Sequence, residues 1–106
     1  MTPHHPSPTV VHYAERQRFE VQLADHLAFL SYQHAGGRVV LDHTYVPNPL
    51  RGRGLANALA LAALEEARRQ GWKIVPECSF VSAFLERHPE FTDLLDRPGA
   101  AGSPLT

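Results

Sequence analysis

The stretch that decides the fold is Arg51-Gly52-Arg53-Gly54-Leu55-Ala56, because it joins a β-like run to an apolar helical run. Residues 38–46 are rich in β-branched side chains, and residues 54–70 place Leu and Ala at helical spacing. Glycines leave backbone N–H groups accessible, arginines add positive charge, and the start of a helix carries the positive end of its dipole. The stretch therefore predicts a phosphate-binding loop.

Two common phosphate-binding loops do not fit this stretch. A P-loop ends in Gly-Lys-Ser or Gly-Lys-Thr, whereas Gly54 is followed by Leu55 and Ala56. A dinucleotide loop follows the first strand of a parallel βαβ unit, whereas this loop follows the third predicted strand. The sequence context therefore excludes a P-loop and a dinucleotide-binding loop, and it does not identify which phosphorylated ligand binds.

The residues before the loop predict three antiparallel strands in meander order. Apolar and polar residues alternate over 18–24, which is the pattern of a strand with one buried face. Asp25-His26 predicts a turn into a second strand over 27–34, and Gly36-Gly37 predicts a hairpin into the third strand over 38–46.

The residues after the loop predict a helix, a strand and a second helix. The first helix covers 54–70 and ends at Gly71, a typical C-terminal cap. A fourth strand over 73–77 precedes a helix over 80–87 capped by Ser79, with a helical turn at 91–95. The predicted order is β-β-β-α-β-α, which is an α+β fold.

Length and composition set the domain limits and exclude some classes of protein. A chain of 106 residues forms one domain, predicted over 18–97, between flexible tails at 1–17 and 98–106. A net charge of -1 disfavours a nucleic-acid binder, and no apolar run is long enough to predict a membrane span. The single Cys78 excludes an intramolecular disulfide, which fits a cytoplasmic protein.

Three blocks of the chain resemble a known family. They are His43-Thr44-x-Val46, then 51–56, then Lys73-Ile74-Val75-Pro76-x-Cys78-Ser79-Phe80-Val81. In this order they resemble the short, single-domain, YjdJ-like branch of the GNAT-type N-acetyltransferases, whose pyrophosphate loop reads Arg/Gln-x-x-Gly-x-Gly/Ala. The resemblance covers about 19–95, essentially the whole predicted core.

The resemblance implies a GNAT-like fold that binds acetyl-CoA or CoA between splayed central strands. The pantetheine arm would run between the strand before the loop and the strand after the helix. A backbone N–H around Tyr45 or Val46 would face the oxyanion. The residues that would hold the pyrophosphate are Arg51, Gly52, Arg53, Gly54, Leu55 and Ala56.

Two residues are candidates for the chemistry. Cys78 precedes a helix N-terminus, a location that favours thiolate, and by the resemblance it lies near the thioester. It either accepts the acetyl group transiently or only lines the pocket. His43 is a candidate general base because imidazole titrates near neutral pH. Strand alternation places His43 on the face of Val39 and Leu41, a possible core face, and Asp42 on the opposite face.

The predicted reaction is acetyl transfer from acetyl-CoA to an unidentified amine. The turn at 24–27 leaves no room for the helices that shape the acceptor site in larger GNAT enzymes. An open acceptor side favours a large acceptor such as an amine on a protein, and it also permits a CoA-binding module with little turnover. No cluster of His, Cys, Asp and Glu has metal-site spacing. The expected state is a monomer or weak homo-oligomer.

Overall fold

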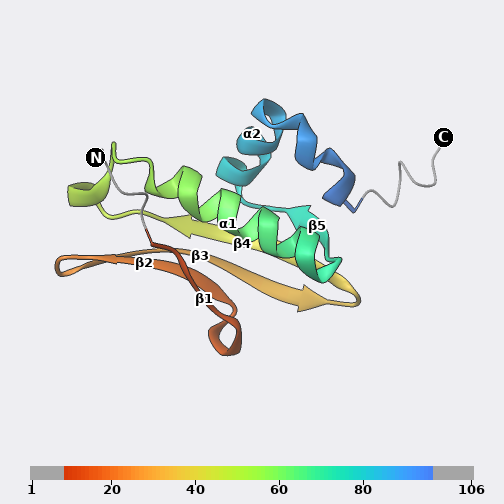
Figure 1. The fold of residues 1–106 in the computed structure, drawn as a ribbon, viewed down its shortest axis with the longest axis horizontal. Coiled ribbons are helices and arrows are strands. Elements are labelled where there is room, and N and C mark those ends of the chain that lie inside the picture. The colour runs from red at the N-terminus through yellow and green to blue at the C-terminus, as the bar shows by residue number, and fades with distance from the viewer. Residues whose placement is uncertain (1–8, 97–106) are drawn as a thin grey trace, which may run out of the picture.

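The computed structural model describes residues 9–96 and contains a five-stranded sheet in the order β1-β2-β3-β4-β5 (Figure 1). The strands are β1 Val11–Tyr13, β2 Arg18–Leu23, β3 His26–Ala35, β4 Arg38–Tyr45 and β5 Lys73–Pro76. The helices are α1 Leu55–Gln70 and α2 Ser79–Arg87, with short 3-10 turns η1 Ala14–Arg16, η2 Asn48–Leu50 and η3 Pro89–Leu94. The predicted α+β fold and its order from β2 to α2 are confirmed.

The first four strands form an antiparallel meander, and β5 joins β4 in parallel. On β2, Phe19 and Val21 are buried and alternate with more polar positions, as the period-two pattern predicted. The turn between β2 and β3 uses Ala24 with a φ of 53°. Gly36 and Gly37 have φ of 61° and 85°, so the predicted glycine hairpin between β3 and β4 is confirmed.

Helix α1 packs one apolar stripe against β2 and β3. The stripe recurs at helical spacing and consists of Leu55, Leu59, Ala60, Ala63, Leu64 and Ala67, all buried. Gly71 ends the helix in the left-handed conformation, and the Trp72 N–H donates to the Ala67 carbonyl, as the cap prediction required. Helix α2 begins at Ser79 with Cys78 as its N-cap, so the prediction that Ser79 caps this helix was wrong.

Strand β1 lies inside the segment that the sequence analysis assigned to a flexible tail over 1–17. In the structure this strand pairs with β2, and Val11 is opposite Glu20. The sheet therefore begins before residue 18. A three-residue strand is too short to show a periodic pattern, and its place comes from pairing rather than from its own residues. The predicted tails at 1–8 and 98–106 lie outside the described residues.

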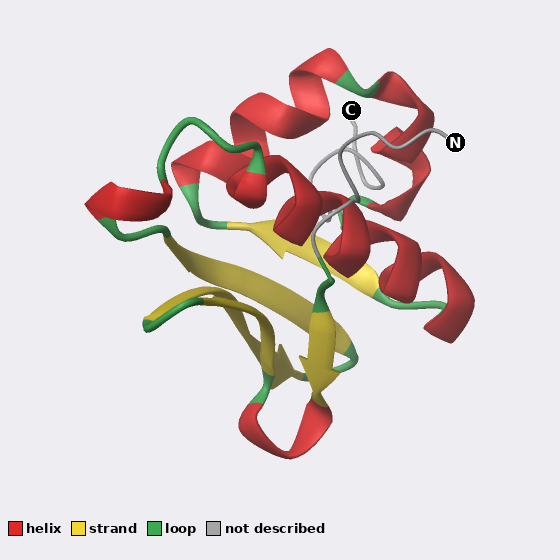
Figure 2. Cartoon of the chain, turned by 60° about the vertical axis from the view of Figure 1, so that its left-hand side comes forward, coloured by secondary structure: helices red, strands yellow, loops and turns green. Residues whose placement is uncertain are grey.

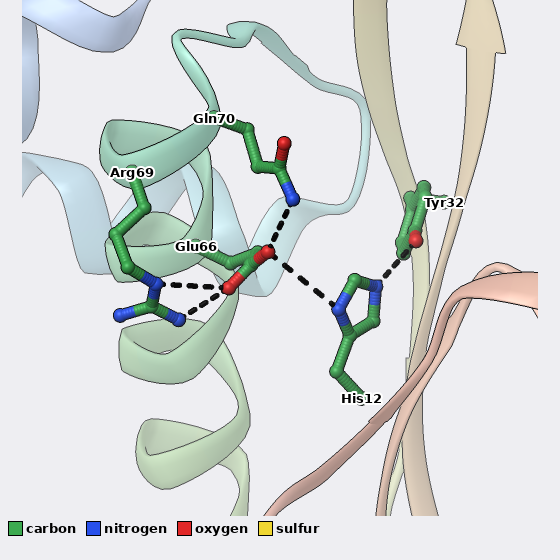
Figure 3. A network of polar contacts seen from close by, with 5 residues as sticks. All are labelled: His12, Tyr32, Glu66, Arg69 and Gln70. Atoms are coloured by element: carbon green, nitrogen blue, oxygen red, sulfur yellow. Dashed lines mark hydrogen bonds and ion pairs between the residues drawn. The ribbon is translucent and has the colours of Figure 1, made fainter.

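A polar network on the helix side fastens β1 to the core (Figure 3). The His12 Nε2 atom lies 2.5 Å from the Tyr32 hydroxyl, and its ring stacks on Phe19 at 4.2 Å. Burial, and then the nearby charge of Glu66, raise the pKa of Tyr32, so the phenol keeps its proton. When the His12 ring carries its proton on Nδ1, the side of Glu66, the Nε2 atom accepts from this hydroxyl. The Nδ1 atom then faces Glu66 on α1, at 3.9 Å from Oε2.

A β-bulge at Asp42 changes which face the end of β4 presents. Tyr32 pairs with Leu41 and Ser31 pairs with His43, which leaves Asp42 as the extra residue. Before the bulge, Leu41 is fully buried on the helix side, whereas after it His43 is exposed and lies beside Phe29. The predictions that His43 shares the face of Leu41 and that Asp42 points away from His43 were wrong, because the bulge reverses the alternation.

The helices and the core lie on one side of the sheet. In Figure 2, α1 and α2 lie above it, and neither covers its lower face. On β3 the buried Ala28, Leu30 and Tyr32 alternate with more accessible residues, which marks the two faces. The uncovered side is called the open face below, and its residues are Arg18, Glu20, Phe29, Ser31, Gln33, Asp42, His43 and Tyr45.

Candidate functional site

The predicted phosphate loop connects η2 to α1 and depends on two glycines. Gly52 has a φ of 82° and Gly54 a φ of 75°, both in the left-handed region that side chains disfavour. A Cβ atom at either position would contact nothing within 4 Å, so the glycines serve backbone conformation rather than tight packing. The left-handed conformations at Gly52 and Gly54 lead the chain from η2 into the first turn of α1.

The start of α1 has the properties of an anion site. Gly54 is its N-cap without a side-chain cap, and its first turn holds no acidic residue. The first backbone bond of the helix joins the Ala58 N–H to the Gly54 carbonyl, so the N–H groups before Ala58 have no partner within the helix. A depression of about 250 Å³ opens here. It is lined by Val46, Leu50, Arg51, Gly52, Gly54, Leu55, Ala56, Asn57 and Phe80.

The two loop arginines have different surroundings. Arg51 Nε donates to the Val46 carbonyl at 3.0 Å, and its backbone N–H donates to the Asn48 carbonyl at 3.1 Å. Its side chain therefore ties the loop to the end of β4. Arg53 is exposed and has no hydrogen bond or ion pair within 9–96. Leu55 is buried in the core, so only its backbone can reach a ligand.

Strands β4 and β5 stop pairing in the middle of β4. Their last paired residues are Leu41 and Pro76, after which the N–H groups of Glu77 and Cys78 both donate to the Leu41 carbonyl at 3.0 Å. Strand β4 continues to Tyr45, so within the described chain its last residues have no strand partner on that side. Unpaired strand groups of this kind can bind an extended ligand by backbone hydrogen bonds.

Cys78 lies where the two strands part. Its side chain is half-buried, and its Sγ donates to the Thr44 hydroxyl at 3.3 Å. Its carbonyl accepts the N–H of Ser82 at 3.1 Å, which starts α2. The thiol therefore joins the end of β4 to the start of α2.

The structure does not bring His43 to Cys78. His43 contacts the ring of Phe29 at 5.8 Å between centroids and lies opposite Ser31 in the strand register, both on the open face. Tyr45 lies on the same face, 44% exposed, and only its backbone is adjacent to Val46 at the depression. The two candidates for the chemistry therefore lie on opposite sides of β4.

Two residues of this region were missed by sequence reasoning. Thr44 was quoted only as part of a motif, yet it is the partner of the Cys78 thiol. Phe80 lies in the helix predicted over 80–87; it is half-buried and lines the depression, whereas Phe84 and Phe91 are buried in the core. The bulge hid the first, because an inward Thr44 is visible only once the alternation is corrected. No pattern in the sequence distinguishes Phe80 from the buried phenylalanines.

Comparisons with known proteins identify relatives over the same core. A family model described as GCN5-related N-acetyl-transferase matches residues 18–94. The chain is 36% identical to Protein NATD1 of Mus musculus over 76% of each chain, and 36% identical to Protein NATD1 of Homo sapiens over 76% of this chain and 74% of that one. Protein NATD1 of Danio rerio is 32% identical over 76% of each.

A solved structure gives the same result for the fold. The solution structure of a GCN5-like protein from Staphylococcus aureus superposes with a TM-score of 0.67 at 25% identity, over 87% of this chain and 91% of that chain. The predicted GNAT-like fold is confirmed, and family and fold together place the chain among the acyltransferases. The chain belongs to the GCN5-related N-acetyltransferase family.

Proposed function

We propose that this protein binds acetyl-CoA and transfers its acetyl group to an amine, with the depression at the start of α1 holding the pyrophosphate. The observation that carries the proposal is the uncapped first turn of α1, with Gly54 in left-handed conformation and no acidic side chain. Such a helix start offers backbone N–H groups and a positive dipole to phosphate oxygens. Membership of the family supplies the choice of acetyl-CoA among phosphorylated ligands.

The loop arginines support this ligand in two ways. Arg53 has no partner within the described residues, so its guanidinium is available for a charge-assisted bond to phosphate. Arg51 keeps the loop attached to Val46 through its Nε, and its remaining N–H groups are available to the same ligand. The unpaired end of β4, through backbone groups around Tyr45 and Val46, is proposed to hold the pantetheine arm and the acetyl oxygen.

Acetyl-CoA supplies the acetyl group as a thioester, and we propose direct transfer: the amine nitrogen bonds to the carbonyl carbon, the C–S bond breaks, and CoA takes up a proton and leaves as the thiol. A cysteine nucleophile is commonly activated by a base within hydrogen-bond reach, which takes the thiol proton. Among the described side chains, the hydrogen-bond partner of the Cys78 thiol is the neutral Thr44 hydroxyl. Cys78 is therefore assigned to the lining of the acetyl site. His43 faces the open side, where an amine can approach, and it is assigned to remove the ammonium proton so that the neutral nitrogen can attack.

A second candidate function is a CoA-binding module with little turnover. The observation that favours it is the uncovered acceptor side, because the first two strands, β1 and β2, are joined by the short turn η1 rather than by longer helices, and β2 and β3 by a tight turn at Ala24. Binding would follow the same loop and strand gap, whereas acetyl transfer to amines would be absent. Under either function, the single unpaired Cys78 fits the reducing cytoplasm, which is the location we propose. We propose a monomer or a weak homo-oligomer as the functional state.

Isothermal titration calorimetry with acetyl-CoA and with CoA tests the proposal. Arg53→Ala should weaken binding about tenfold and reduce its salt dependence, because one charge-assisted bond contributes roughly 1.5–3 kcal/mol. Arg87→Ala removes the same charge at the far end of α2 and should leave the affinity unchanged. Absence of heat with both ligands, or equal affinity in Arg53→Ala and wild type, would count against the site. Acetylation of added amines by the wild type then separates the enzyme from the module.

A further inference from the structure

Asp42 is a carboxylate of the open face that has no cationic partner within residues 9–96. Its Oδ1 accepts a hydrogen bond from the Ser31 hydroxyl at 2.6 Å, and its Oδ2 accepts one from Gln33 Nε2 at 2.7 Å. Both donors are neutral, so the charge stays uncompensated while the carboxylate is held in place. Each oxygen keeps a further lone pair for another donor.

Glu20, the other carboxylate of the open face, differs from Asp42 because it has cationic partners. Glu20 is 7% exposed and lies 3.5 Å from Arg16 and 3.4 Å from Arg18, so its charge is neutralised. The guanidinium of Arg18 also covers the ring of Phe29, at 3.8 Å from its centroid. On the open face Glu20 therefore has two cationic neighbours, whereas Asp42 on β4 has none within residues 9–96 and can pair with a cationic ligand.

Aromatic rings continue along the strand from Asp42. The rings of His43 and Tyr45 each lie within 6 Å of Phe29, at 5.8 Å and 5.7 Å between centroids. Phe29 is already covered by Arg18, but Tyr45 is 44% exposed and His43 is exposed. A carboxylate next to accessible aromatic faces suits an alkyl-ammonium ion, since the charge pairs with the carboxylate and the carbon chain contacts the rings.

The position of Asp42 connects this face to the strand gap. Asp42 directly follows Leu41, whose carbonyl accepts the N–H groups of Glu77 and Cys78 at the point where β4 and β5 part. Asp42 therefore follows, in the chain, the residue at which the strand gap opens, and its side chain lies on the opposite side of β4 from the Cys78 thiol. The bulge makes this arrangement, because it turns Asp42 and His43 to the same face.

The geometry points to the open face around Asp42 as the site that recognises the acceptor, a lysine side chain on an extended protein segment. The lysine ammonium pairs with Asp42 beside His43, and its flexible stem lies along Tyr45. An accessible sheet face, uncovered by α1 or α2, admits a large acceptor (Figure 2). Asp42 is thus a recognition and positioning residue. The inference rests on the proposed function.

The test is an NMR titration of the isotope-labelled full chain, first saturated with CoA, with a short blocked peptide that contains one lysine. A matched peptide with norleucine lacks only the ammonium group. We expect the lysine peptide to change the chemical shifts of protein amides in β3 and β4 around Phe29, Asp42 and Tyr45. The norleucine peptide should produce shift changes that are several-fold smaller. Asp42→Asn should weaken lysine-peptide binding about tenfold. Glu65→Gln, which removes an exposed charge on α1, should not.

The outcomes separate this inference from the proposed function. Failure to bind CoA contradicts the proposed function, and it is seen before any peptide is added. CoA binding without open-face shifts, equal binding of both peptides, or unchanged binding in Asp42→Asn overturns the inference alone. Tighter binding of spermidine than of the peptide would assign the face to a free polyamine and overturn the protein acceptor. If Asp42→Asn does not fold, the salt dependence of the wild type decides, since binding that ignores salt excludes the ion pair.

Discussion

The thiol of Cys78 donates a hydrogen bond to the hydroxyl of Thr44 at 3.3 Å, across 34 positions of sequence. This contact joins the first turn of α2 to the end of β4, just beyond the last residues that β4 and β5 pair. It holds the two elements together beside the proposed acetyl site. It also occupies the thiol with a neutral partner, which underlies the assignment of Cys78 to the lining.

Replacing Cys78 tests that assignment. Cys78→Ala should bind acetyl-CoA within about tenfold of the wild type, because it loses one hydrogen bond worth roughly 1 kcal/mol and a small packing contact. Acetyl transfer should remain measurable in the variant. Intact-mass spectrometry of the wild type after exposure to acetyl-CoA should show no acetyl group on Cys78. An acetylated cysteine that an added amine removes would establish the covalent route instead.

The glycine at the N-cap of α1 should tolerate few substitutions. Gly54→Ala should lower the free energy of unfolding by roughly 1–2 kcal/mol, since a left-handed φ is costly for a residue with a Cβ. Chemical denaturation measures this loss. Gly54→Asn should lose less, because asparagine enters the left-handed region more readily. Equal stability of Gly54→Ala and wild type would mean that the loop relaxes away from the observed conformation.

Glu66 should make stability depend on pH in the acid range. Hydrogen bonds from Gln70 and Arg69 lower the pKa of Glu66 below its ordinary 4.5, so the folded state favours the carboxylate. This stabilisation is complete above the unfolded pKa and is lost as the pH falls through the folded one. Glu66→Gln should therefore be less stable than wild type at about pH 7, and the difference should shrink towards about pH 3.

The control for this prediction is Glu65→Gln, which removes an exposed charge from the neighbouring position of α1. Its effect on the urea midpoint should be small, because a single exposed charge contributes little to stability. A pH-independent difference between Glu66→Gln and wild type would indicate lost packing rather than lost charge.

The attachment of β1 should depend on the Tyr32 hydroxyl. Tyr32→Phe removes the group that donates to His12 Nε2 and should cost roughly 1 kcal/mol. Amide hydrogen exchange should speed up in Val11–Tyr13 more than in β3, because an edge strand with few other contacts opens locally. Tyr13→Phe serves as the matched control, since the Tyr13 hydroxyl makes no hydrogen bond within 9–96. Equal amide exchange rates of Val11–Tyr13 in the two variants would mean that strand pairing alone keeps β1 attached to the sheet.

Much of the fold followed from local residues. The alternation at Phe19 and Val21 located β2, the Gly36-Gly37 pair located the hairpin, and Gly54 and Gly71 bounded α1. Each of these signals is local, because a side chain or a missing Cβ restricts the backbone at its own position. The predicted loop accordingly lies between β4 and α1, but α1 already begins at Leu55, so only residues 51–54 of the predicted 51–56 precede the helix.

The periodicity and backbone freedom of neighbouring residues were enough to predict the meander, the α1 helix and the glycine-containing turn before it. Only the tertiary structure decided the bulge at Asp42, and with it the faces of Asp42, His43 and Thr44. It also decided the strand at Val11–Tyr13 and the Thr44–Cys78 contact. A bulge, an edge pairing and a long-range contact arise when separate strands and helices pack together, so no run of neighbouring residues encodes them.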